Sequence, residues 1–193
     1  RFIDVLKLAK KLGMRTSIGT IGTRLADPEF AAAALPFLDE ALFSIHGPDA
    51  ETHNALTQRP WSFDKVTRAF QNCVSLKPEF GAFVNTVVTR HNVDVLPDTA
   101  EMVDRMGAKL LIISNLTPEG AGFDTYEDLA VPLHTLSKVL PLIPPRVQSA
   151  VVRFFAVPMC ILGEHAMLSN DLHWDPRVTV EWGSQPGKVI FEG

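Results

Sequence analysis

Polar side chains recur at the ends of four apolar runs, and their types suit the binding of a small polar molecule. The runs end at residues 16–20, 44–46, 89–92 and 114–115, with helical patterns between them. Hydroxyl, amide, imidazole and guanidinium groups there can all form hydrogen bonds with a ligand. Parallel strands that all carry polar residues at their carboxyl ends place them on one rim of a sheet or barrel. We therefore expect a ligand site along that rim.

Strands that run in one direction are needed to build such a rim, and the hydrophobic pattern predicts them. Residues 41–47 form an apolar run with a polar tip and a closing glycine, and residues 80–89 are rich in the β-branched and aromatic types that favour strands. Residues 110–113 are entirely apolar, which indicates a fully buried strand. Further strands are predicted at residues 14–21 and 147–157.

Amphipathic helices are predicted before and between these strands. From Phe2 to Leu12 apolar residues recur at helical spacing, and Gly13 is placed to end the helix. We expect this helix to cover the core with its apolar stripe. Other helices are predicted from Asp27 with Pro28, from the segment after Pro48, from Ser62 as an N-terminal cap, from about Val95, and over residues 126–140.

The alternation of helices and strands predicts an α/β fold with a mostly parallel sheet, open or curled into part of a barrel. The alternation weakens in the last third of the chain. Residues 177–181 and 188–191, separated by the turn-forming run 183–187, favour a β-hairpin. We divide the chain into a partial (β/α) barrel at residues 1–157 and a C-terminal extension with this hairpin at residues 158–193.

The composition of the chain limits the classes of molecule that it is expected to bind. The chain has 193 residues, 46% of them apolar, which suits a single domain with a sizeable core. A net charge of -4 with scattered basic residues argues against nucleic acid binding through a basic face, so a small molecule or peptide is expected. No apolar run reaches membrane-spanning length without a charge or a proline. The two cysteines do not form a disulfide framework and fit a reducing cytoplasm.

Five segments follow one another in an order typical of one enzyme superfamily. They are FSIHGP at residues 43–48, THNALT at 52–57, WSFDKV at 61–66, NTVVTRHN at 85–92 and ISNLTPEG at 113–120. Together they resemble the middle of a radical S-adenosylmethionine (radical SAM) enzyme, which commonly has a strand ending in Ser-hydrophobic-His/Asp-Gly, a His-Asp-x-hydrophobic-Thr-Gly segment and a Gly-Ser-Phe helix start. The last two segments resemble its fifth strand, with a terminal Asn, and its sixth strand, with a Pro-x-Gly exit. The resemblance extends from about Phe2 to Gly120.

The resemblance implies a TIM-like partial (β/α) barrel of the radical SAM type, truncated at its N-terminus. Such enzymes reductively cleave S-adenosylmethionine at a 4Fe-4S cluster, and the resulting 5′-deoxyadenosyl radical modifies a small-molecule or peptide substrate. A reducing partner such as flavodoxin or ferredoxin supplies the electron. The chain is therefore expected to be a fragment of a cytoplasmic radical SAM enzyme.

The resemblance further implies that the cluster ligands lie outside this chain. The superfamily holds its cluster with three cysteines in a Cys-x3-Cys-x2-Cys loop after the first strand, and the cofactor's amino group with a Gly-Gly-Glu-Pro-like turn after the second. Neither motif is present, and two isolated cysteines cannot supply three thiolates. The chain as given is expected to begin on the second helix of the barrel and to be inactive.

Three rim residues acquire cofactor-binding roles from the resemblance. Ser44 would hydrogen-bond the ribose hydroxyls, although a serine at a strand end also commonly bonds nearby backbone. Arg90 would hold the cofactor's carboxylate through a bidentate pair, or else be a surface arginine. Asn92 would either contact the cofactor or cap the following helix.

The sixth strand of the superfamily's barrel brings backbone groups to the adenine, and Ser114, Asn115 and Leu116 occupy that place. The alternative is a strand-to-loop turn that uses Asn for its tolerance of unusual dihedrals. His46 is also assigned to the cofactor site, but a family position that accepts Asp as well favours a structural polar contact over proton transfer. His53 is expected to tie its loop down.

Cysteines and acidic residues offer weaker candidates for metal binding. Cys73 lies on the apolar stripe of its helix and is expected to be a buried small hydrophobe. Cys160 is a candidate ligand of an auxiliary cluster, because relatives often carry Pro-x-Cys there, although a packing role is favoured. Asp171, His173 and Asp175 could form a metal trio, but two-residue spacing in a loop is not specific.

Two other functions stay open on the sequence alone. The first is a metal-dependent (β/α)-barrel lyase or hydrolase, for which six histidines could supply ligands. No His-x-His or His/carboxylate pair falls at ligand spacing on one predicted strand, which counts against it. The second is a non-catalytic binding module derived from such a barrel.

Overall fold

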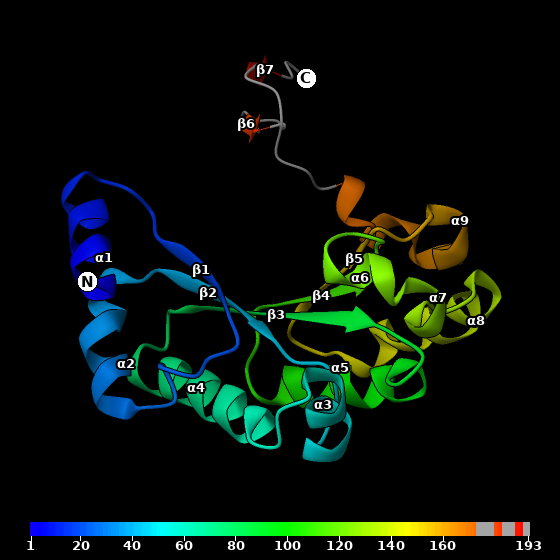
Figure 1. Cartoon of the computed structure of the whole chain (residues 1–193), viewed down its shortest axis with the longest axis horizontal. Helices are drawn as coiled ribbons and strands as arrows, with labels where there is room; N and C mark the ends of the chain where they lie inside the picture. The colour runs from blue at the N-terminus through cyan, green and yellow to red at the C-terminus, as the bar shows by residue number, and fades with distance from the viewer. Residues whose placement is uncertain (173–179, 183–187, 191–193) are drawn as a thin grey trace.

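A five-stranded parallel sheet forms the centre of the computed structural model, which describes residues 1–172, 180–182 and 188–190 (Figure 1). The strands follow one another across the sheet in chain order, and every neighbouring pair is parallel. The sheet is open, with β1 and β5 at its edges. The predicted α/β partial-barrel class is therefore confirmed. The strands are β1 (Ser17–Thr20), β2 (Glu40–Ser44), β3 (Gly81–Val88), β4 (Leu110–Asn115) and β5 (Val151–Phe155).

Helices connect the strands, since strands that run in the same direction need a crossover between them. Helices α2, α4 and α5 line one side of the sheet (Figure 1). Within the described residues no helix combines the length and the apolar character needed to cross a membrane. The helices are α1 (Phe2–Lys11), α2 (Pro28–Ala34), α3 (Ala50–Thr57), α4 (Ser62–Leu76), α5 (Leu96–Arg105), α6 (Ala121–Asp124), α7 (Tyr126–Leu129), α8 (Leu133–Val139) and α9 (Met159–Leu162).

The two faces of the sheet differ in what covers them. Strand residues that point toward the helices, such as Phe43, Val84 and Ile113, are fully buried. Phe43 packs edge-on against Phe70 of α4, with 5.3 Å between the ring centroids. Most alternate residues are half-buried or exposed, and Phe155 keeps 46% of its surface exposed. We call this second side the open face; its side chains are Glu40, Leu42, Ser44, Phe83, Asn85, Val87, Leu110, Ile112, Ser114, Val151, Arg153 and Phe155.

Local signals in the sequence set several helix boundaries. The Asp27 side chain accepts hydrogen bonds from the backbone N–H groups of Glu29 and Phe30, and Pro28 is the first residue of α2. Gly13 follows α1 with a φ of 76°, in the left-handed region that glycine adopts without strain. The predicted start of α2 and the predicted end of α1 are therefore confirmed.

The expected burial of the apolar stripe of α1 is wrong for most of its residues. Leu6 is buried, but Phe2, Val5 and Leu12 are exposed. The reason is that α1 packs against α2 and the short helix η1 (Leu35–Phe37) near one edge of the sheet, not across its face (Figure 1). An apolar surface is thus left uncovered beside β1.

An ion pair fixes α1 to the start of β2. Lys10 Nζ donates to the two carboxylate oxygens of Asp39 at 2.6 and 2.7 Å, and Asp39 also accepts from the Thr16 backbone N–H at 2.7 Å. These bonds lower the pKa of Asp39 to about 2. Thr16 precedes β1 and also donates its hydroxyl to the Phe37 carbonyl at 2.7 Å. The prediction that places Thr16 on the rim is therefore wrong, because this residue lies at the opposite strand end.

The Asp104 carboxylate of α5 fixes the chain just before β5. It accepts hydrogen bonds from three consecutive backbone N–H groups, those of Gln148 at 2.9 Å, Ser149 at 3.0 Å and Ala150 at 2.7 Å. Burial raises the pKa of Asp104, but these three bonds lower it more, so the pKa lies below its usual value. The strand predicted over residues 147–157 is correspondingly shorter, because its first N–H groups bind a side chain instead of a strand.

The C-terminal part of the chain adds a second, smaller sheet. Strands β6 (Val180–Trp182) and β7 (Lys188–Ile190) pair antiparallel, as the predicted hairpin requires. The predicted turn at residues 183–187 lies outside the described residues, as do residues 177–179 and 191 of the predicted strands.

Replacing Asp104 with Asn is expected to lower the free energy of unfolding by about 1–3 kcal/mol, because a neutral amide is a poorer acceptor for three N–H groups. Urea unfolding would measure the change. Asp98→Asn is the matched control, since Asp98 lies on the same helix but is exposed and pairs with Arg146 at 3.4 Å. Equal losses for the two variants would contradict the role given to Asp104.

Candidate functional site

The carboxyl ends of β2, β3 and β4 lie along one edge of the sheet, as their parallel pairing requires. Ser44 ends β2 beside Asn85, and Asn115 ends β4 beside Val88. Arg90 follows the end of β3 by two residues. The structure therefore brings Ser44, Arg90 and Asn115 to the same edge.

Three polar side chains from neighbouring strands lie on the open face close to this edge. Ser44 is in register with Asn85, and Ser114 is in register with Val87. The Ser114 hydroxyl donates a hydrogen bond to Asn85 Oδ1 at 2.6 Å. Asn85 is not among the site residues predicted from the sequence. An amide inside a run of apolar and β-branched residues is uncommon in strands and is the signal that could have identified it.

Asn92 fastens the tips of β2 and β3 together. It is 1% exposed, and its Nδ2 donates to the carbonyl oxygens of His46 and Val87, both at 2.9 Å. Its Oδ1 accepts from the Thr89 backbone N–H at 2.8 Å and from the Thr89 hydroxyl at 3.2 Å. The amide thus uses two donors and two acceptor sites within the protein. Its side chain does not cap the following helix η2 (Val93–Val95).

Two histidines stack at the end of β2 and accept hydrogen bonds from the backbone. The His46 N–H donates to His53 Nδ1 at 3.0 Å, and the Val87 N–H donates to His46 Nδ1 at 3.3 Å. The rings lie 5.7 Å apart and nearly parallel. Burial lowers the pKa of His46 to about 4; burial and the neighbouring His46 lower the pKa of His53 to about 4. Both rings are therefore neutral near pH 7 and are poor general acids there.

The histidine pair is expected to make the protein less stable as the pH falls from about 6.5 toward 4. In this window the unfolded histidines bind protons near their reference pKa of about 6.5, whereas the folded ones do not until about pH 4. The unfolded state thus binds more protons, and the free energy of unfolding falls by about 5 kcal/mol across the window if both rings contribute fully. Urea unfolding at pH 7, 6 and 5 measures this slope.

His53→Gln should flatten that pH dependence, because the variant has one fewer ring to protonate on unfolding. His134→Gln is the matched control, since His134 is an exposed residue of α8. The explanation fails if His53→Gln and the unmodified protein show the same slope.

A hydrogen-bonded cluster holds the loop and helix that follow β2. Asn54 Oδ1 accepts from the Phe63 N–H at 2.9 Å and from the Ser62 hydroxyl at 3.0 Å, and Asn54 Nδ2 donates to the Pro60 carbonyl at 3.0 Å. The predicted cap Ser62 is therefore wrong: Ser62 is already the first residue of α4, and Asn54 caps this helix from α3. The segments at residues 52–57 and 61–66 thus hold α3 against the start of α4.

Gly47 lets the chain turn closely from β2 into α3. A Cβ atom at this position would lie 2.6 Å from the Thr52 Cβ, which is closer than carbon atoms can approach. A larger residue would therefore push α3 away from the tip of β2.

Arg90 is exposed, and it joins the loop after β3 to the segment before α8. Its Nε donates to the Ala130 carbonyl at 2.8 Å, and its backbone N–H donates to the Leu129 carbonyl at 2.9 Å. No hydrogen bond of its Nη1 or Nη2 occurs among the described residues. Asn115 and Leu116 are half-buried at the neighbouring strand end.

The described part of the chain offers no ligand set for a metal cluster. No three His, Cys, Asp or Glu side chains gather in it, and two of the suggested trio, His173 and Asp175, lie outside the described residues. Cys73 is buried, as predicted, and burial raises the pKa of its thiol to about 12. The expected packing of Cys160 is wrong, because α9 leaves this thiol exposed.

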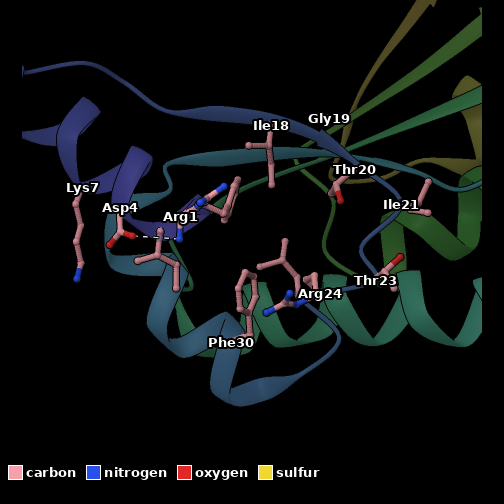
Figure 2. A pocket seen from close by; sticks show the side chains of 13 residues that line it. Arg1, Asp4, Lys7, Ile18, Gly19, Thr20, Ile21, Thr23, Arg24 and Phe30 are labelled. Atoms are coloured by element: carbon pink, nitrogen blue, oxygen red, sulfur yellow. Dashed lines mark ion pairs between the residues drawn. The ribbon is translucent and has the colours of Figure 1, made fainter.

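A hollow of about 980 Å³ lies between α1, α2 and the outer part of β1 (Figure 2). Ile18 and Phe30 contribute apolar walls, and the Arg24 guanidinium lies 4.4 Å from the centre of the Phe30 ring. Thr20, at the carboxyl end of β1, lines this hollow, but none of the predicted cofactor-binding residues does.

Comparison of the sequence with known proteins identifies relatives over about two-thirds of the chain. No family model matches it. The mycofactocin maturase MftC of Mycolicibacterium smegmatis is 38% identical over 130 residues, which are 66% of this chain and 32% of that protein. The AdoMet-dependent heme synthase of Methanosarcina barkeri is 27% identical over 127 residues, which are 64% of this chain and 36% of that protein. The chain thus spans about a third of the length of these curated relatives.

Comparison of the structure identifies a neighbour with the same fold. A domain of a pyruvate-formate lyase-activating enzyme from Bacteroides vulgatus superposes with a TM-score of 0.58. The match covers 78% of this chain and 88% of that domain, at 14% sequence identity. At this identity the likeness is a likeness of fold.

Proposed function

This chain belongs to the radical SAM superfamily, and we propose that it supplies the cofactor-binding rim of a radical SAM enzyme. The observation that carries the proposal is the convergence of polar groups from three adjacent parallel strands. Ser44, Asn85 and Ser114 lie on the open face near the carboxyl ends, and Arg90 and Asn115 follow on the same edge. Such a rim is where α/β sheets and barrels bind ligands.

Each group on the rim suits one part of S-adenosylmethionine. We assign Ser44 to the ribose hydroxyls, and Arg90 to the carboxylate, because its terminal nitrogens can form a bidentate, charge-assisted pair. We assign the chain at Ser114, Asn115 and Leu116 to the adenine edge, where backbone groups can donate and accept.

The roles of His46 and Asn92 in this proposal are to shape the site. Asn92 uses its amide groups inside the protein, and His46 accepts a backbone N–H through Nδ1. Both keep the β2 tip in place beside β3, so that Ser44 has a fixed position. Asn85 orients the Ser114 hydroxyl on the next strand.

The cluster is assigned to a segment outside this chain, because the described residues do not fit its three thiolate ligands. Bound together, the cluster and S-adenosylmethionine supply a 5′-deoxyadenosyl radical after one-electron reduction. We expect the electron to come from a small reducing protein such as flavodoxin or ferredoxin, in the cytoplasm. The chain alone is expected not to turn over.

The open face is the proposed place of the substrate, a small molecule or a peptide. Its apolar residues, among them Leu42, Phe83 and Ile112, can exclude water from a reactive carbon radical.

We propose residues 1–157 as the barrel portion and residues 158–193 as an extension. The uncovered apolar side of α1 and the outer edge of β1 are where the remainder of the barrel would pack.

Anaerobic reconstitution of the full-length protein with iron and sulfide tests this function. The expected result is cluster absorbance and formation of 5′-deoxyadenosine from S-adenosylmethionine in the presence of a reductant. Full-length protein that takes up no iron but binds a peptide or partner would instead be the non-catalytic module. A metal-dependent lyase or hydrolase is not supported, because no ligand set occurs in the described part of the chain.

Ser44→Ala and Arg90→Ala are expected to weaken S-adenosylmethionine binding without unfolding the protein. The loss should be about fivefold for the neutral hydrogen bond of Ser44 and about tenfold or more for the charged pair of Arg90. Isothermal titration calorimetry on the full-length protein measures both. Ser75→Ala and Arg68→Ala, on the exposed side of α4, are matched controls. Unchanged affinity in both rim variants would refute the site assignment.

A further inference from the structure

Arg153 is a charged residue in the interior of a parallel strand. In β5 it lies between Val152 and Phe154, which are buried toward the helices, so its side chain belongs to the open face. Its neighbours on that face, Val151 and Phe155, are apolar and are each 46% exposed. A half-buried guanidinium among apolar side chains loses hydration, and this cost is offset when an anion binds to it.

Arg153 stands at one end of a row of paired residues that crosses four strands. It is in register with Ile112, Ile112 with Asn85, and Asn85 with Ser44. Since neighbouring strands lie about 4.8 Å apart, Arg153 is about 14 Å along the row from Ser44. That separation leaves room for a second molecule beside a cofactor held at the Ser44 end.

The charge of Arg153 is not neutralised by any carboxylate among the described residues. The five strands contain two charged residues, Glu40 and Arg153, and Glu40 is bound to Arg15. Nη1 of Arg153 donates to its neighbour's carbonyl, that of Val152, at 2.9 Å. This bond restrains the orientation of the guanidinium. The other N–H groups of this planar group stay available to a ligand.

We propose that Arg153 binds a carboxylate of the substrate and so holds it across the open face. The inference rests on the proposed function, which places S-adenosylmethionine at the Ser44 end of the row. A carboxylate matches the fork of an arginine with two parallel hydrogen bonds. The apolar neighbours Ile112 and Phe155 reduce the local dielectric, and this strengthens the pair.

Helix α5 fixes the position of Arg153 by binding the chain just before β5. Asp104 binds the backbone N–H groups of residues 148–150, and β5 begins immediately afterwards at Val151. Register with β4 then fixes Arg153 opposite Ile112. An anchor on a fixed strand orients its ligand better than one on a loop. The substrate class that follows is a carboxylic acid, either a free acid or peptide C-terminus, or an acidic side chain of a peptide.

Isothermal titration calorimetry with three probes tests the inference on the full-length protein. N-acetylphenylalanine carries a free α-carboxylate, N-acetylglutamic acid α-amide carries a side-chain carboxylate, and N-acetylphenylalaninamide carries no charge. We expect at least one acid to bind, and the acid that binds more tightly identifies the source of the carboxylate. Arg153→Gln should weaken acid binding at least tenfold. Arg153→Lys, which keeps the charge but not the fork, should weaken it less.

The controls separate this inference from the proposed function. Arg146→Gln alters an arginine that pairs with Asp98 and Glu101, and it should leave acid binding unchanged. S-adenosylmethionine affinity, measured in the same samples, should be equal in Arg153→Gln and the unmodified protein. If the unmodified protein does not bind S-adenosylmethionine, the proposed function fails. If no acid binds, if the amide binds as well as the acids, or if neither Arg153 variant weakens acid binding, the assignment of Arg153 is overturned.

Discussion

The buried amide of Asn92 is the interaction on which the arrangement of the strand tips depends. Strand β2 stops pairing at Ser44, yet the chain continues beside β3 because Asn92 holds the His46 carbonyl and the Val87 carbonyl at once. Removing it would leave buried carbonyl and N–H groups without partners, each at a cost of about 1–3 kcal/mol. The histidine pair lies beside this anchor, because the Val87 N–H donates to His46 Nδ1 and the His46 N–H donates to His53 Nδ1.

The chemistry of the open face follows from the pleat of the strands. Alternate residues of β2, β3 and β4 are committed to the helix side, where Phe43 and Ile113 are fully buried. The remaining alternate positions lie outside this helix-covered core and carry Ser44, Asn85 and Ser114. The residues of one face thus hold the sheet and the helices together, and those of the other face form the surface that we propose binds a cofactor and a substrate.

The order and direction of the strands could be predicted because hydrophobic periodicity and helix-ending glycines are local features. The presence of the polar strand-end residues at one edge of the sheet could be predicted in the same way, since parallel strands align their carboxyl ends. Contacts between distant segments could not be predicted. Asn54 caps α4 in place of Ser62 because α3 turns back toward it, and Asp104 shortens β5 from a different element. The hydrophobic periodicity of α1 indicates that the helix has an apolar side. It does not indicate which part of the protein covers that side, so the exposure of these residues could not be predicted.

The outer side of β1 has a consequence for handling this chain by itself. β1 has β2 as its strand neighbour, and its other side presents backbone N–H and C=O groups that no described strand pairs with. Unpaired strand edges are templates for intermolecular pairing, and the apolar side of α1 lies next to this one. The isolated 193-residue chain is therefore expected to self-associate through edge-to-edge hydrogen bonding as its concentration rises.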